Sequence, residues 1–214
     1  TAGCLVLLST LILPPTVMSQ AQDNSKAGPP TEAELIQILR SDAPSAAKAP
    51  ACKQLAIYGS EAAVPELAKL LADEQLASWS RIALEAIPGS AADEALRQAI
   101  PSLKGKLLVG VINSLGVRQD VAAVEVLTGR LQDQDVEVAS AAAVALGHIG
   151  NTAAVKALQQ SLAGAPAPVR TAIAEGCVLC AERLLAAGSR DEAVALYDQV
   201  RKAEVPRQNV LEAT

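Results

Sequence analysis

Aromatic residues are scarce in this sequence. The 214 residues include one Trp, two Tyr and no Phe. Surfaces that bind sugars or single-stranded nucleic acid usually stack their ligands on aromatic rings, and three rings cannot supply such a platform. The apolar half of the composition comes from Ala, Leu, Val and Ile instead, which favours closely packed helices over strands.

Histidine occurs once, as His148, and the usual catalytic signatures are missing. The sequence has no GxSxG, HExxH, GxGxxG or EF-hand loop. Lys104-Gly-Lys106 is basic but lacks the glycine spacing and the final Ser or Thr of a phosphate-binding loop. His148 lies at the end of an expected helix, where a cation complements the helix dipole. We therefore predict no catalytic residue, no cofactor and no enzyme in this segment.

Positive charge is neither abundant nor clustered. The 18 Lys and Arg are outnumbered by 23 Asp and Glu, which gives a net charge of −5. A nucleic-acid partner requires a basic stripe that follows the phosphate backbone. We therefore predict a protein partner, or an adjoining domain of the same chain, and no nucleic acid.

Four cysteines are present, and two of them form the motif Cys177-Val-Leu-Cys180. A closed metal site needs about four ligands, and with Cys52 several repeats away and a single His we predict no metal. Haem attachment would require a His where Ala181 stands. On an apolar helix the pair fits two small buried side chains. The alternative is a redox or disulfide pair of an exported protein, although a disulfide between i and i+3 of a helix would be strained.

The first residues resemble an export signal. The run from Cys4 to Leu13 is apolar and is followed by Pro14-Pro15 and small residues, which predicts a signal peptide over 1–21 with an incomplete basic start. Cleavage is expected after Ala21, or alternatively after Ser19. The run is shorter than the roughly 20 apolar residues of a membrane span, so no stable anchor is expected. We predict a periplasmic or extracellular protein.

Glycines mark a repeat in the remaining chain. After a polar linker at 22–30, Gly residues at loop-like positions recur at 59, 89, 116, 150 and 188, with spacings of 30, 27, 34 and 38 residues. Self-similarity at that period is typical of a solenoid. The folded part is expected to begin near Thr31.

Each repeat contains two expected helices. The first helices, with apolar residues at i, i+3, i+4 and i+7, are expected at 32–44, 61–73, 91–100, 120–133 and 151–164. The second, richer in Ala, are expected at 46–58, 76–87, 104–115, 136–149 and 169–187. Pro50 should kink or delay the earliest of these second helices.

Two stretches, Val64–Asp73 and Val124–Gly150, resemble bacterial HEAT repeats. The resemblance covers 31–188 and implies an all-α fold, an armadillo-like α-solenoid (superhelix) of about five HEAT-like helix pairs. Ala139 stands where the family usually has Arg early in the second helix, which weakens the polar ladder between repeats. The segment 189–214 resembles half of a tetratricopeptide unit and ends as a further helix begins near Asn209.

The resemblance implies a non-catalytic scaffold for protein–protein interaction. The second helices should line a concave surface that presents side chains of both charges to a partner protein. Lys53 is one of these charged residues. The expected surface residues are Trp79, Arg81, Glu85, Glu137, Arg170 and Glu175. Trp79 has a second interpretation as a core or seam residue, because it shares a face with Leu76, Ala83 and Ile87.

Two other functions remain open. The order of signal, linker and Ala-rich repeats is similar to the N-terminal part of large exported bacterial proteins, which implies an accessory arm of an exported enzyme, such as a carbohydrate-active or other hydrolase, whose catalytic domain lies beyond Thr214. The second of these functions is that of a HEAT-like lyase subunit. The iron hydroxylases on this fold use His-Glu pairs on successive repeats, and a single His excludes that site.

Overall fold

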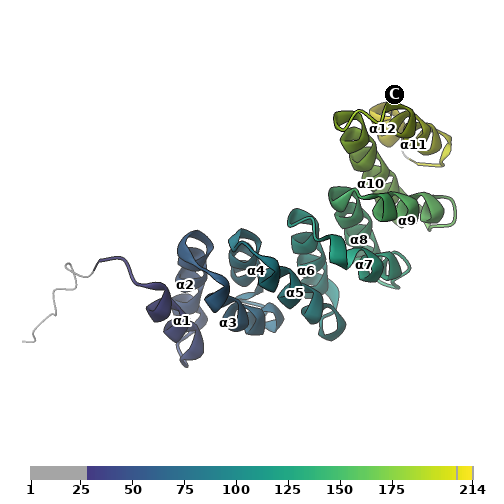
Figure 1. The fold of residues 1–214 in the computed structure, drawn as a ribbon. Helices are drawn as coiled ribbons and strands as arrows, with labels where there is room; N and C mark the ends of the chain where they lie inside the picture. The colour runs from purple at the N-terminus through teal and green to yellow at the C-terminus, as the bar shows by residue number, and fades with distance from the viewer. Residues whose placement is uncertain (1–27, 206, 214) are drawn as a thin grey trace, which may run out of the picture. The chain divides into compact units, whose positions relative to one another are not determined.

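The computed structural model describes residues 28–205 and 207–213, and these residues are helical with short connections (Figure 1). In chain order the α-helices are α1 Glu32–Arg40, α2 Ser45–Tyr58, α3 Val64–Lys69, α4 Ala77–Ala86, α5 Ser90–Ala99, α6 Gly105–Val117, α7 Val124–Arg130, α8 Val136–Ile149, α9 Thr152–Leu162, α10 Ala167–Ala186, α11 Arg190–Lys202 and α12 Arg207–Glu212. Short 3₁₀ turns extend α3, α5 and α7 at Glu61–Ala63, Leu70–Ala72, Ile100–Ser102 and Val121–Ala123. The all-α prediction is confirmed.

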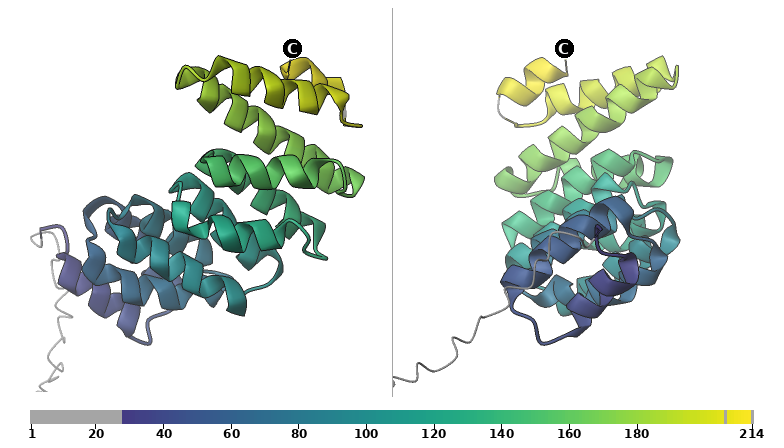
Figure 2. Two further views of the ribbon diagram at one scale, coloured as in Figure 1. Left: turned by 45° about the vertical axis from the view of Figure 1, so that its right-hand side comes forward. Right: turned by 90° about the vertical axis from the view of Figure 1, so that its left-hand side faces the viewer.

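Consecutive helices form antiparallel pairs that stack into a solenoid. Within Thr31–Thr214, which is one compact unit, the even-numbered helices α2, α4, α6, α8 and α10 each pack on the next even-numbered helix. The odd-numbered helices α1, α3, α5, α7 and α9 lie along the other side, and this unit bends toward the even-numbered helices (Figure 1). Figure 2 shows the same two layers from two further directions.

Local sequence signals set the helix ends. Thr31 and Glu34 form a reciprocal capping box at the start of α1. The side chains of Asp135 and Asn151 accept hydrogen bonds from backbone N–H groups that open α8 and α9. Gly150 ends α8 in the left-handed conformation, at φ 60°, which glycine adopts without a steric penalty.

Four of the five marker glycines lie at helix ends or in loops, and the fifth prediction is wrong. Gly116 lies inside α6, buried against α8. The left-handed residue after that helix is Gln119, at φ 54°. A glycine in a periodic sequence can mark either a turn or a close helix contact, and spacing alone does not separate the two.

The second helices were predicted closely. α8 spans Val136–Ile149 as expected, and α4, α6 and α10 differ from the expected ranges by one or two residues at each end. Pro50 lies inside α2, which begins at Ser45. The proline therefore does not delay the helix. The segment after Gly188 forms α11 and α12, and its likeness to a tetratricopeptide unit stays a prediction.

Arginines connect the N-terminal helix pairs. Arg40 donates to the buried carboxylate of Glu66 at 2.9 Å, and Arg97 pairs with Asp120. Arg118, at the end of α6, pairs with Asp93 and donates to the backbone carbonyl oxygens of Leu84, Glu85, Ile87 and Gly89 around the end of α4. We call these contacts the arginine seams.

Small residues close the contacts of α6 with α8 and of α8 with α10. A Cβ added to Gly116 would lie 2.9 Å from the Cα of Ala145, and one added to Gly147 would lie 2.7 Å from the Cα of Gly176. Ala139, which replaces the expected Arg, is fully buried. These backbones approach so closely that no larger side chain fits, and we call these contacts the glycine seams.

The predicted signal peptide lies outside the described residues, as does most of the 22–30 linker. None of the described helices is both long enough and apolar enough to cross a membrane.

Candidate functional site

The outward side of the even-numbered helices is the candidate site. Each of these helices buries most of its surface against its paired odd-numbered helix and its even-numbered neighbours. α2, α4, α6 and α10 each leave a stripe in solvent, whereas α8 exposes only Val136 and Glu137, at its start. In α4, Ala77, Ala83 and Leu84 are buried while Ser78 and Ile82, four residues apart, are exposed. Residues four apart share one face of a helix. We name the combined stripes the even-helix face.

The exposed members of the even-helix face come from all five helices. They include Lys53 and Ile57 from α2, Trp79 and Ile82 from α4, Lys106, Asn113 and Val117 from α6, Glu137 from α8, and Glu175 and Glu182 from α10. In α6 and α10 the exposed residues again recur at helical spacing, since 113 and 117, and 175 and 182, are four and seven apart. The stripes lie side by side because the even-numbered helices pack on one another.

Large apolar side chains gather on the N-terminal half of this face. The exposed fractions are 67% for Ile57, 38% for Trp79, 47% for Ile82 and 60% for Val117. The C-terminal half exposes two such residues, Val136 of α8 and Leu185 of α10, at 44% each. Scattered exposed hydrophobic residues are normal, whereas a group of them on adjacent elements marks an interaction surface. The predicted surface residue Trp79 belongs to this group, and it is more exposed than its core or seam interpretation predicts.

Charge on the same face changes sign along the array. Lys53 and Lys106 are exposed on α2 and α6. Glu137, Glu175 and Glu182 are exposed on α8 and α10. The face therefore has a basic and apolar half followed by an acidic half.

Arg81 and Glu85, two of the predicted surface residues, take part in a contact between helices. Arg81 donates to the carbonyl oxygen of Gly110 at 3.1 Å and to the hydroxyl of Ser114 at 3.3 Å. The Ser114 hydroxyl donates to Glu85 at 2.6 Å. The two side chains retain exposed fractions of only 22% and 24%. Their geometry holds α4 on α6, and most of their charge is used within the array.

Arg170 also contacts its own chain. Its guanidinium donates to the carbonyl oxygen of Ala165 at 2.9 Å and reaches Glu204, beyond α11, at 3.4 Å. Glu137 and Glu175, in contrast, are exposed on the even-helix face. The structure thus brings Trp79, Glu137 and Glu175 to one surface and gives Arg81, Glu85 and Arg170 internal partners.

Several exposed residues of the face were not among the surface residues predicted from the sequence. These residues lie outside the buried stripe of their helices and are Ile57, Ile82, Val117, Lys106 and Glu182. An available signal was that Ile57 follows Lys53, and Val117 follows Asn113, by four residues, which puts each pair on one face. The apolar character of Ile57, Ile82 and Val117 favoured assigning them to the core rather than to the surface.

The paired cysteines lie deep in α10. Cys177, Cys180 and Cys52 are free thiols with no measurable exposure. Burial raises the pKa of the Cys177 thiol to about 12 and that of the Cys180 thiol to about 11. A thiolate, the reactive form in exchange and oxidation, is therefore scarce at neutral pH. The redox or disulfide role of this pair stays a prediction that these environments disfavour.

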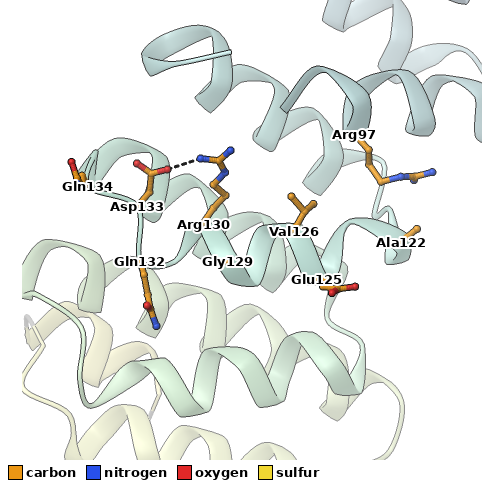
Figure 3. Close-up of a pocket in the computed structure, with 9 residues that line it drawn as sticks. All are labelled: Arg97, Ala122, Glu125, Val126, Gly129, Arg130, Gln132, Asp133 and Gln134. Atoms are coloured by element: carbon orange, nitrogen blue, oxygen red, sulfur yellow. Dashed lines mark hydrogen bonds and ion pairs between the residues drawn. The ribbon is translucent and has the colours of Figure 1, made fainter. Parts of the chain in front are cut away.

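Open grooves lie between the odd-numbered helices. One of about 910 Å³ is lined by residues of α5, α7 and the loop after α7 (Figure 3). Its two arginines are paired, Arg97 with Asp120 and Arg130 with Asp133. The backbone N–H of Asp135 and then Arg130 lower the pKa of Asp133. The groove brings together no nucleophile with a base, and we assign it no chemistry.

Within the described residues, no group of three or more His, Cys, Asp or Glu is placed to hold a metal ion.

The comparisons with known proteins agree with this architecture. Residues 94–177 match the family of HEAT repeats, a stretch that runs from α5 into α10. No curated protein sequence matches the chain. The match supports a HEAT-like repeat protein.

Among solved structures, the chain is similar to a crystal structure of an engineered protein from the Northeast Structural Genomics Consortium. The two are 20% identical with a TM-score of 0.50 over 85% of this chain and 93% of that chain. A second engineered protein from the same consortium is 21% identical, with a TM-score of 0.48 over 85% of this chain and 56% of that chain. The first likeness supports the helical solenoid fold, and at this identity it carries no function.

Proposed function

We propose that this chain is a non-catalytic scaffold that binds another protein along the even-helix face. The observation that carries the proposal is the exposure of Ile57, Trp79, Ile82 and Val117 together on adjacent helices. Water around such a group is displaced when a partner covers it, and apolar burial is the main driving force of protein association. HEAT-like arrays present extended surfaces of this kind.

The proposal also places the scaffold outside the cytoplasm, in the periplasm or beyond the cell. Support for export comes from the apolar run between Cys4 and Leu13. The partner can be a separate protein or an adjoining catalytic domain of the same chain, and both would cover the same face.

Site-specific photo-crosslinking tests the proposal. A benzophenone side chain replaces Ile82 on the even-helix face, and in a matched variant it replaces Gln132, which is exposed in the loop after α7 and lines the groove beside α5 and α7. In the native host we expect one defined adduct from position 82 and none of that mass from position 132. Mass spectrometry identifies the partner, or an intramolecular crosslink if it is an adjoining domain. An adduct formed at 132 and not at 82 would refute the assignment of the face.

The identified partner then allows a binding measurement with purified proteins. Replacement of Trp79 by Ala together with Ile82 by Ser removes the two central apolar side chains of the face. We expect the Kd to rise at least about tenfold, because buried aromatic anchors dominate protein interfaces. Lys156→Ala, an exposed change on α9, should leave the Kd unchanged. Equal affinity of all three proteins would contradict the proposal.

A further inference from the structure

We infer that the even-helix face recognises a linear protein segment with ordered charge, in which acidic and apolar residues form one half and basic residues form the other. The acidic and apolar half of the bound segment lies over α2, α4 and α6 of this chain, and its basic half lies over α8 and α10. This inference rests on the proposed function, because it names the chemistry of the partner that the face binds.

The order of charge follows from which ionised groups remain available. Arg81 and Glu85 hold each other and Ser114, within the α4–α6 contact. Arg170 is directed to Ala165 and Glu204. Once these internally used groups are set aside, the exposed charges of the face are Lys53 and Lys106 in the first half, and Glu137, Glu175 and Glu182 in the second half.

Most of the apolar contact belongs to the first half. The first half exposes four large apolar side chains on α2, α4 and α6, namely Ile57, Trp79, Ile82 and Val117. The second half exposes two, Val136 at the start of α8 and Leu185 near the end of α10, while Val144 and Leu179 within these helices are half-buried. A complementary segment therefore needs most of its apolar residues among its acidic ones. This arrangement separates the expected ligand from a uniformly charged tail, which would meet repulsion over one half of the face.

The face also sets a minimum length. Packed helices lie about 8–10 Å apart, so the four steps from α2 to α10 span roughly 40 Å. An extended chain advances about 3.3 Å per residue, so a segment of about 12 residues bridges both halves. A shorter segment reaches only one sign of charge and loses the order.

Charge on an exposed face chiefly sets orientation and association rate, and apolar contact supplies most of the affinity. The two effects can therefore be separated by experiment. Loss of the apolar group should abolish binding, whereas reversal of charge in one half should change which segments bind.

Selection from a random 16-residue peptide display library on the purified full chain tests the inference. We expect enriched peptides to carry Asp and Glu with apolar residues toward one end and Lys and Arg toward the other. The same selection on Lys53→Glu/Lys106→Glu, whose face is acidic throughout, should enrich peptides with basic residues at both ends. A reciprocal variant, Glu175→Lys/Glu182→Lys, should favour acidic residues at both ends.

Binding of one charge-ordered peptide gives the quantitative test. We expect the Lys53→Glu/Lys106→Glu variant to bind it at least about tenfold more weakly at 0.05 M salt, and the difference to shrink at 0.5 M salt because exposed charges are screened. Lys156→Glu, on the odd-numbered side, serves as the matched control and should bind as the wild type does. Circular dichroism melting of all the variants confirms that they fold.

The failures of the two proposals are distinguishable. Enriched peptides that lose binding in Trp79→Ala/Ile82→Ser but show no order of charge, or that are the same for wild type and Lys53→Glu/Lys106→Glu, overturn the charge-ordered ligand and leave the binding face intact. Peptides insensitive to Trp79→Ala/Ile82→Ser, or an absence of enriched peptides, overturn the linear ligand, whereas the proposed function is overturned by the crosslinking outcome at positions 82 and 132.

Discussion

The guanidinium of Arg118 donates to the carbonyl oxygen of Ile87 at 2.7 Å and so joins the end of α6 to the end of α4. Ile87 is the residue at which α4 stops, and the last carbonyl groups of a helix have no partner within it. Arg118 supplies donors to that helix end while pairing with Asp93 of α5. Its side chain is only 10% exposed, so water replaces it poorly.

We expect Arg118→Ala to lower the free energy of unfolding by about 2–4 kcal/mol, because it leaves Asp93 and several carbonyl oxygens without a partner. Urea unfolding followed by circular dichroism measures the change. Arg201→Ala, which breaks a more exposed pair with Asp198 within α11, should cost about 0.5 kcal/mol or less. Equal losses in the two variants would contradict the role given to Arg118.

Glycine substitutions separate close packing from helix propensity. Gly147→Ala would place a methyl group 2.7 Å from the Cα of Gly176, and we expect a loss of about 1–3 kcal/mol from overpacking. Gly129, in α7, has nothing within 4 Å of an added Cβ. Gly129→Ala should therefore stabilise the protein by about 0.5–1 kcal/mol through helix propensity. Thermal or urea unfolding gives both values, and a destabilised Gly129→Ala would argue against this explanation.

Alkaline pH should destabilise the fold through its buried thiols. Burial raises the pKa of Cys52 to about 11 and that of Cys177 to about 12, from an ordinary value of 9.0. The folded state therefore binds more protons than the unfolded chain above pH 9. Stability should fall between about pH 9 and 11, by up to about 1.4 kcal/mol per pH unit for each thiol.

Urea unfolding at several pH values measures this slope. In a Cys52→Ala/Cys177→Ala/Cys180→Ala variant the slope above pH 9 should become shallower, whatever the variant's stability at pH 7. A slope identical to that of the wild type would exclude the thiols as its cause. In the folded wild type, alkylation of these three cysteines at pH 7 should be slow, because the thiols are buried and protonated.

At acidic pH the Arg40–Glu66 contact should weaken. Hydrogen bonds from Lys69 and then Arg40 lower the pKa of Glu66, so its contribution to stability is present above its ordinary value of 4.5 and is lost as the pH falls below that. We expect Glu66→Gln to destabilise the protein at pH 7 and to reduce the difference between pH 7 and pH 3. Glu125→Gln, an exposed change on α7, should leave that difference unaltered.

The sequence predicted the helix pairs because the apolar period and the helix ends are local properties. α8 has its predicted bounds, since Asp135 caps one end and Gly150 the other. Gly116 was misassigned to a loop. Its lack of a side chain allows α6 to pack closely against Ala145 in the next repeat. Contacts between repeats depend on which residues meet across a seam, and the period of one helix does not contain that information.

The candidate site was predicted in part for the same reason. Glu137 and Glu175 are exposed on the second helices, as expected, and their role in binding stays a prediction. Arg81 and Arg170 were chosen as charged residues, but a charge on a helix can face a partner protein or a neighbouring carbonyl group. Ser114, the residue that joins Arg81 to Glu85, lies in another repeat and has no distinctive signal of its own.

The two kinds of seam give the array an uneven elasticity. Long arginine side chains can rotate and slide while they keep some of their hydrogen bonds, and added salt weakens their ion pairs. Backbones in contact at Gly147 and Gly176 have no such freedom, and ionic strength does not act on them. We expect the N-terminal helix pairs to extend more readily under force than the part of the array from α6 to α10. In single-molecule stretching, high salt should lower the stiffness of the N-terminal helix pairs only. An equal loss of stiffness in both parts would contradict this division.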